Sequence, residues 1–223
     1  MGYWSSLAAL SLLSGCGGNQ SALQPAGIGA ERIAQLFWWM AAGAAVIWVV
    51  VIGFAIYATR IKTKTQSPRR AHWMIIGAGA IFPTIVLGAL LIFSMQLMPA
   101  LSAPGKSGFR IAVSGEQWWW RVTYETPSGA TVELANEIRL PVGERVEFRL
   151  SSPDVIHSFW IPSLGGKVDM IPGRVTRPAP EPTEVGVYRG ACAEYCGTSH
   201  ALMNFPVVVM EPEAFDALSL IHI

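Results

Sequence analysis

The chain has 223 residues, which is long enough for one compact domain with additional segments. Hydrophobic residues make up 52% of it and charged residues only 14%, whereas about a quarter of a soluble domain is usually charged. This composition argues against an ordinary soluble protein, and the net charge of +1 says nothing by itself about partners.

An apolar run at the N-terminus, residues 1–15, ends in small residues directly before Cys16. Such a run is typical of an export signal. Leu-Ser-Gly followed by cysteine also resembles a bacterial lipobox, in which the cysteine is lipidated and becomes the new N-terminus. No Lys or Arg precedes the run, so a plain apolar tail with an incidental cysteine is the alternative. Residues 16–35 contain Gly, Asn, Gln, Ser and Pro and predict a flexible exported linker.

Two long uncharged segments follow, residues 36–59 and residues 73–95. Each exceeds the roughly 20 residues that a helix needs to cross a bilayer, and aromatic residues near their ends suit the membrane interfaces. Pro83 is expected to kink the second helix. Residues 36–96 are therefore predicted to form a transmembrane α-helical hairpin.

The loop between these helices, residues 60–72, is basic: it carries five Lys and Arg residues and no acid. By the positive-inside rule it stays in the cytoplasm, so both outer ends of the hairpin face the opposite side. A nucleic-acid patch is not expected here, because the loop is short and lies between two membrane spans.

Residues 97–216 have a different character, with short β-branched and aromatic runs that Gly, Pro and Ser interrupt. Apolar residues alternate with polar ones at 138–142 and again at 146–150, which predicts two paired strands around a turn at Gly143. Further strands are expected at 109–113, 120–124, 186–189 and 205–210. Many short strands at this spacing predict an all-β Greek-key sandwich or barrel. The apolar residues 217–223 are of doubtful origin and support no prediction.

The stretch from Cys192 to Met203 carries most of the chemical information: two thiols, an imidazole and a thioether within twelve residues, with His157 upstream. Thiolate and thioether are soft donors and imidazole is borderline, and this mixture suits copper. Two thiolates four residues apart can bridge two copper ions. Each ion then takes one histidine and one weak donor, which are Met203 and a backbone carbonyl between the cysteines. The motif predicts a dinuclear copper electron-transfer centre.

Simpler explanations of these residues exist. Two cysteines in an exported domain often form a disulfide, a Cys2His2 set can hold structural zinc, and a lone histidine or methionine is usually a packing residue. None of them explains why both histidines and Met203 accompany both cysteines.

The pattern from Cys192 to Met203, preceded by His157, resembles the CuA signature of cytochrome c oxidase subunit II. Gln117–Trp120, Ile161–Gly165 and Asp169–Arg174 resemble that family too, in the same order. The resemblance implies a cupredoxin-like fold. It also implies a set of copper ligands: His157, Cys192, Glu194 through its carbonyl, Cys196, His200 and Met203. The Glu194 carboxylate matches a residue that reaches a magnesium or manganese ion at the boundary with subunit I.

The resemblance also implies roles around the centre. Trp118 corresponds to the exposed tryptophan through which cytochrome c delivers its electron. Glu116 and Asp154 are candidate docking acids, since residues 97–223 hold 14 acids and ten bases and an acidic surface attracts a basic partner. Asp169 and Arg174 are assigned to the interface with the catalytic subunit.

Together these features predict the CuA subunit of a bacterial haem–copper terminal oxidase, an oxidoreductase complex of the respiratory chain. The subunit accepts electrons from cytochrome c and passes them to the haem–copper catalytic subunit, which reduces oxygen to water. The expected partners are subunit I, subunit III and membrane lipid, but no nucleic acid. The expected location is the bacterial inner membrane, with the copper domain on the periplasmic side.

Two features limit this prediction. Residues 67–72 lack the carboxylate that many family members carry before the second helix, which puts proton uptake by that route in doubt. No Cys-x-x-Cys-His motif is present, so no fused c-type haem is expected. The alternatives are an exported copper carrier or assembly protein, and an exported structural lipoprotein with a Cys192–Cys196 disulfide.

Overall fold

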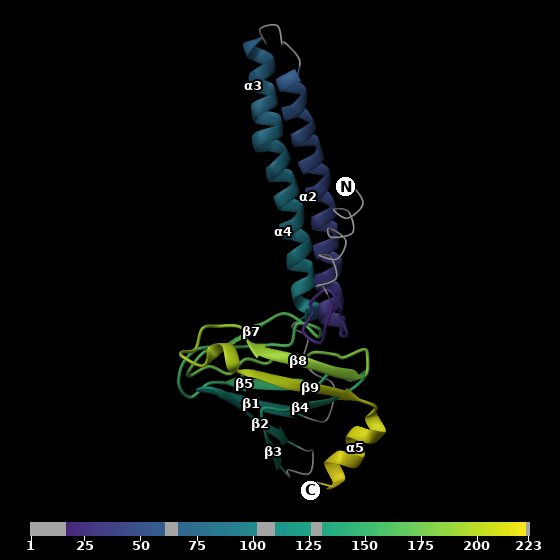
Figure 1. The fold of residues 1–223 in the computed structure, drawn as a ribbon, viewed down its shortest axis with the longest axis vertical. Helices are drawn as coiled ribbons and strands as arrows, with labels where there is room; N and C mark the ends of the chain where they lie inside the picture. Colours follow the sequence, from purple (N-terminus) through teal and green to yellow (C-terminus); the bar gives the residue numbers. More distant parts are fainter. Residues whose placement is uncertain (1–16, 61–66, 102–109, 126–130, 222–223) are drawn as a thin grey trace, which may run out of the picture. The chain divides into compact units, whose positions relative to one another are not determined.

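The computed structural model describes residues 17–60, 67–101, 110–125 and 131–221. The chain divides into two compact units (Figure 1): Leu36–Ala100 forms one, and Met1–Gln35 with Leu101–Ile223 forms the other. The expected export signal and Cys16 lie outside the described residues.

The first unit is helical. Helix α2 (Ile28–Arg60) is followed by α3 (Pro68–Ile76), the π-helix η2 (Gly77–Ile81) and α4 (Phe82–Leu101). Within the described residues, two helical stretches are long and apolar enough to cross a bilayer, Ile28–Arg60 and Pro68–Pro99. Their apolar side chains are largely exposed within this chain, as expected for helices that face lipid or partner helices. The two long apolar helices of the predicted hairpin are confirmed.

Pro83 alters the second helix by widening it. Proline has no N–H and cannot donate to the carbonyl four residues earlier. Directly before it the chain adopts the π-helix η2, in which the Phe82 N–H donates to the Gly77 carbonyl five residues back. The Thr84 hydroxyl donates to the Ala80 carbonyl at 2.7 Å.

The second unit is a two-layer β-sandwich. One sheet has the strand order β3-β2-β1-β5 and the other β4-β9-β8-β6-β7. The strands are β1 (Arg110–Glu116), β2 (Trp119–Glu125), β3 (Thr131–Ala135), β4 (Ile138–Pro141), β5 (Glu147–Ser151), β6 (His157–Trp160), β7 (Val168–Met170), β8 (Gly186–Cys192) and β9 (Asn204–Met210). A 3-10 helix, η3 (His200–Leu202), precedes β9, and α5 (Pro212–Ile221) follows it. The all-β, cupredoxin-like fold is confirmed.

The predicted pairing of residues 138–142 with 146–150 is wrong. Strand β4 pairs in parallel with β9, and β5 pairs in parallel with β1 in the other sheet. Leu140 and Phe148 are both fully buried, so each segment does bury one face. Alternation of apolar and polar residues shows only that a strand buries one face. Both sheets bury a face in the same core, so alternation does not show which sheet a strand joins. The turn at Gly143, with φ of 76°, therefore carries the chain from one sheet to the other.

An aromatic cluster fills the core between the sheets. Trp120 is fully buried, and its ring centroid lies 5.7 Å from that of Phe159 and 5.1 Å from that of Phe205. Phe159 and Phe205 stack with centroids 5.1 Å apart. The Trp120 ring centroid also lies 6.2 Å from that of His157, so the aromatic cluster is next to a predicted metal ligand.

Residues 17–27 pack against the sandwich, in contrast to the flexible linker that their composition predicts. The Ala26 N–H donates to the Ser163 carbonyl at 2.7 Å, and its carbonyl accepts from the Thr183 N–H at 2.8 Å. A side chain at Gly27 would lie 3.0 Å from the carbonyls of Leu164 and Glu181. Glycine is needed here because the two backbones approach so closely.

The C-terminal residues also belong to the folded unit. Residues 217–221 continue helix α5, which begins at Pro212. Phe215 of this helix is buried, and its ring centroid lies 6.4 Å from that of Tyr124. Helix α5 therefore packs against β2 through Phe215.

The close approach of β8 and Phe205 can be tested by Gly190→Ala. The new Cβ would lie 2.1 Å from Cζ of the Phe205 ring, which the aromatic cluster holds in place. We expect the free energy of unfolding to fall by about 1–3 kcal/mol. Chemical denaturation of the detergent-solubilised chain, followed by tryptophan fluorescence, measures this.

Gly165→Ala is the matched control, because no heavy atom lies within 4 Å of its new Cβ. It should change the stability by no more than about 0.5 kcal/mol. Equal unfolding midpoints for the two variants would contradict the packing described here.

Candidate metal centre

The second sheet brings the predicted copper ligands together. His157 is the first residue of β6 and Cys192 the last of β8, and these strands are antiparallel neighbours in which Phe159 pairs with Cys192. The loop from β8 to β9 supplies Cys196 and His200, and Met203 directly precedes β9. His157 is thus placed by strand pairing, over 35 residues of sequence.

Each thiol has its own imidazole and its own weak donor. Cys192 Sγ lies 3.8 Å from His157 Nδ1 and 3.2 Å from the Glu194 carbonyl oxygen. Cys196 Sγ lies 3.5 Å from His200 Nδ1 and 3.7 Å from Met203 Sδ. This arrangement matches the donor set that two bridged metal ions require.

The separation of the two sulfurs fits a pair of ions. Both described cysteines are free thiols, and their sulfurs lie 3.7 Å apart, well beyond the roughly 2.05 Å of a disulfide bond. A zinc–thiolate bond is about 2.3 Å long, and copper is a similar first-row ion. Twice that length exceeds 3.7 Å, so an ion can bond both sulfurs from either side of the line that joins them. Two thiolates at this spacing can bridge two ions.

Burial affects how a metal would load. His157, Cys192, Cys196 and Met203 are buried, and His200 is half-buried. Burial raises the pKa of the Cys196 thiol to about 12, and the neighbouring Cys192 adds to the rise. The metal-free thiol is therefore protonated at neutral pH, and a metal ion must displace that proton when it binds.

Asp154 orients the first imidazole. Its Oδ1 lies 2.9 Å from His157 Nε2, and a carboxylate only accepts hydrogen bonds. Nε2 therefore carries the proton, and Nδ1 presents its lone pair on the side of Cys192. Burial alone would raise the pKa of Asp154. Hydrogen bonds from His157, Val155, Gln117 and Ser152 outweigh this effect and lower the pKa below the ordinary value.

Asp154 and Glu116, the two predicted docking acids, both form contacts within the domain. The Asp154 oxygens accept from the Gln117 N–H at 2.7 Å and the Val155 N–H at 2.6 Å, besides facing His157. Glu116 forms an ion pair with Arg121 at 2.9 Å. Both carboxylates have partners inside the domain, so neither is a free surface charge.

Trp118 and Gln117 touch the loop between β8 and β9, residues 193–203, which we call the copper loop. Trp118 Nε1 donates to the Cys196 carbonyl at 3.1 Å, and Gln117 Nε2 donates to the same oxygen at 2.9 Å. The Trp118 side chain is still 38% exposed. Gly197 has φ of 120°, and a Cβ there would lie 3.1 Å from both side-chain nitrogens. Glycine lets the loop pass close to these two side chains.

Glu194 and Asp169 are linked by a residue that the sequence did not single out. Lys167 Nζ lies 3.2 Å from Glu194 Oε2 and 3.1 Å from Asp169 Oδ1. The Ser158 hydroxyl donates to Asp169 at 2.8 Å. Arg174 is exposed. No spacing rule connects Lys167 with Glu194, because the contact depends on where β7 begins beside the copper loop.

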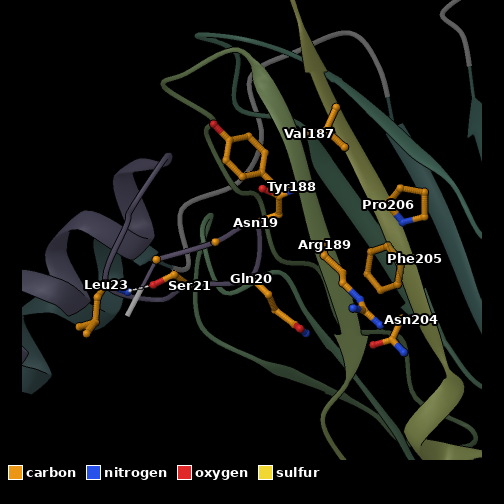
Figure 2. Close-up of a pocket in the computed structure, with 12 residues that line it drawn as sticks. Asn19, Gln20, Ser21, Leu23, Val187, Tyr188, Arg189, Asn204, Phe205 and Pro206 are labelled. Carbon is orange, nitrogen blue, oxygen red and sulfur yellow. Dashed lines mark hydrogen bonds between the residues drawn. The ribbon is translucent and has the colours of Figure 1, made fainter. Parts of the chain in front are cut away.

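An open pocket also lies on this unit, between residues 17–23 and the outer face of strands β8 and β9 (Figure 2). Arg189, Asn204 and Pro206 line its strand side. None of the predicted copper ligands lines it, so it is separate from the metal centre.

Comparison with known proteins finds relatives of the family that the metal-ligand pattern resembles. Residues 125–211 match the family model described as cytochrome C oxidase subunit II, periplasmic domain. Cytochrome c oxidase subunit 2 of Alkalihalophilus pseudofirmus is 33% identical over 92% of this chain and 63% of its own length. Probable cytochrome c oxidase subunit 2 of Rickettsia prowazekii is 28% identical over 74% of this chain and 59% of its own length. The chain thus spans about three fifths of these curated relatives.

Among solved structures, the periplasmic domain of subunit II of cytochrome oxidase (CoxB) of Bradyrhizobium japonicum is similar. It is 29% identical, with a TM-score of 0.48, over 52% of this chain and 94% of that one.

A pair of apolar helices and a cupredoxin-like sandwich with clustered Cys and His residues are the features of a membrane protein with a candidate metal site. Its sequence relatives make the class specific. In sequence, the chain resembles the cytochrome c oxidase subunit II family.

The role of Asp154 can be tested by Asp154→Asn. The amide would leave His157 Nε2–H without its carboxylate, so we expect copper affinity to fall about 10-fold or more. Competition with a chelator of known copper affinity measures this. Glu116→Gln is the matched control, because Glu116 bonds Arg121 rather than a ligand. If both variants bound copper as tightly as the wild type, Asp154 would not orient the ligand.

Proposed function

We propose that this chain is the electron-accepting CuA subunit of a haem–copper terminal oxidase. It takes electrons from cytochrome c and passes them to a catalytic subunit that reduces oxygen to water. One observation carries the proposal: each of two buried thiols has its own imidazole and its own weak donor. A disulfide or a single tetrahedral zinc site does not need that arrangement.

The residues would divide the work as follows. Cys192 and Cys196 would bridge the two copper ions, and the pair would supply one-electron transfer with the charge shared between both metals. His157 and His200 would complete the strong donors. The Glu194 carbonyl and Met203 would be weak donors that tune the potential more than they hold the metal.

Trp118 is the proposed point at which electrons arrive. Its ring is partly exposed and its Nε1–H bonds the carbonyl of Cys196, so one side chain connects the surface with a proposed ligand. Cytochrome c is the proposed donor. Because Glu116 and Asp154 have internal partners, they would contribute to the field of the docking surface but not as free charges.

A copper carrier is the alternative function. A carrier must release its metal readily, which requires access to the ligands. Here Cys192, Cys196, Met203 and His157 are all buried, and His157 is held by Asp154. Burial on this scale favours a resident cofactor over a transferred one.

The proposed setting is the bacterial inner membrane, with the sandwich on the periplasmic side and the loop at residues 60–72 in the cytoplasm. Subunit I would contact the Glu194, Asp169 and Arg174 side of the domain, and subunit III and lipid would complete the surroundings. A magnesium or manganese ion at Glu194 would share the carboxylate with Lys167. Lipidation of Cys16 belongs to the same proposal.

The copper centre is tested by counting copper in the freshly reconstituted wild type and in two variants. The wild type should hold two copper ions with a delocalised spin-resonance hyperfine pattern. Cys196→Ser should hold at most one copper with a single-copper spectrum, because one bridge is lost. Met203→Leu should keep two coppers with a shifted potential, because it removes only a weak ligand. A wild type with one copper or none would end the CuA proposal.

The electron route is tested by Trp118→Ala, which should slow the reduction of copper by cytochrome c without loss of copper. Trp118→Phe is the matched control for the indole N–H, since it keeps a ring but cannot donate to the Cys196 carbonyl. Stopped-flow absorbance measures the rate. An unchanged rate in Trp118→Ala would refute the assignment.

The orientation is tested by labelling Ser67→Cys with a membrane-impermeant thiol reagent in spheroplasts. Ser67 is exposed at the start of α3, so it should react only after the membrane is permeabilised. Val185→Cys, on the exposed surface of the sandwich, should react without permeabilisation. The reverse pattern would contradict the proposed topology.

A further inference from the structure

The copper loop is fastened to the rest of the sheet by a closed ring of polar contacts. The Ala193 N–H donates to the Ser158 carbonyl at 2.9 Å. The Ser158 hydroxyl donates to Asp169, Asp169 pairs with Lys167, and Lys167 pairs with Glu194. Glu194 follows Ala193 in sequence, which closes the ring. One of its contacts, from Ser158 to Asp169, is between strands that are already paired, since these two residues are register partners.

The ring includes Glu194, whose backbone carbonyl points at the proposed ligand Cys192. The Glu194 carbonyl oxygen lies 3.2 Å from Cys192 Sγ, while the side chains of Glu194 and Tyr195 are exposed. An exposed loop residue is free to rotate its peptide unless something holds it. The Ala193 N–H holds one side of this residue, and the Lys167 ammonium holds the other through the carboxylate.

The ring also passes next to His157, the proposed imidazole ligand beside Cys192. Ser158 is fully buried and directly follows His157. The Glu194 carbonyl and the His157 imidazole, the two donors next to Cys192, are therefore both positioned by the paired strands β6 and β7. None of the contacts that form the ring involves Cys196, His200 or Met203.

We propose that Lys167 is a positioning residue of the metal centre: its ammonium group holds the Glu194 carbonyl toward Cys192 and so sets the oxygen donor at one of the two metal positions. This inference rests on the proposed copper function. Lys167 would not bond the metal itself. It would act by restricting the loop, and the cost of losing it would appear at one metal more than at the other.

The experiment uses the full chain in detergent and begins without metal. Amide hydrogen exchange of residues 193–196 is compared in the wild type and Lys167→Met. An exposed ion pair contributes little, so we expect the variant to exchange about two- to fivefold faster in this loop and unchanged in β1 and β2. Lys167→Arg, which keeps a cation in reach of both carboxylates, should restore the wild-type rate. Equal exchange in the wild type and Lys167→Met would overturn the proposal.

The copper-loaded protein supplies a second readout. Lys167→Met should keep two coppers but show an altered hyperfine pattern and a shifted potential, because one oxygen donor has moved. Arg189→Met is the matched charge control: Arg189 lies on β8 three residues before Cys192, forms no ion pair with any described residue and faces the pocket of Figure 2. An equal change of hyperfine pattern in Arg189→Met would overturn the proposal, since a charge effect would then suffice.

A double-variant cycle separates the ion pair from other effects of Lys167. If Lys167 acts through the Glu194 carboxylate, Lys167→Met combined with Glu194→Gln should exchange no faster than either single variant. Additive effects would overturn the proposed route. A wild type that bound no copper would refute the copper function, whereas the exchange result would still report on the ring.

Discussion

The approach of two buried thiols to 3.7 Å is the constraint on which the rest of the domain depends. Two buried thiols stay this close only if the backbone segments that carry them are fixed in position. Strand β8 ends at Cys192, whose N–H donates to the Met203 carbonyl at 2.9 Å. This hydrogen bond joins the two ends of the loop that connects β8 with β9. Inside that closed loop, η3 brings His200 to Cys196.

The aromatic core supplies the stiffness that such a loop needs. Trp120 packs against Phe159, Phe205 and the His157 ring, and Phe205 lies one position into β9 after Asn204. Because protein interiors are close-packed, a ligand that is backed by fixed rings has little room to move. This suits a centre that exchanges electrons with small structural change. Glycine at position 190 lets the Phe205 ring approach β8 closely enough to complete the cluster.

Polar contacts outside the core then distribute roles among residues that look alike. Asp154 and Glu116 are both acids near Trp118, yet one orients His157 and the other neutralises Arg121. Glu194 and Asp169 are both acids near the loop, and Lys167 joins them. Residues 17–27 are polar and rich in small residues, yet they are bonded to Ser163 and Thr183 rather than free. In each case the partner of a residue, rather than its type, decides what it does.

The sequence by itself determined the features that depend on local composition. Uncharged runs predicted the two membrane helices, alternation predicted strands such as β4 and β5, and the donor types from Cys192 to Met203 predicted a soft-metal site. Only the tertiary structure decided which strands pair and which polar groups meet. Alternation shows that a strand buries one face but not which neighbour it joins, so β4 and β5 were wrongly paired. The contacts of Asp154 with His157 and of Lys167 with Glu194 depend on how strands and loops meet in the folded core, which no spacing along the chain encodes.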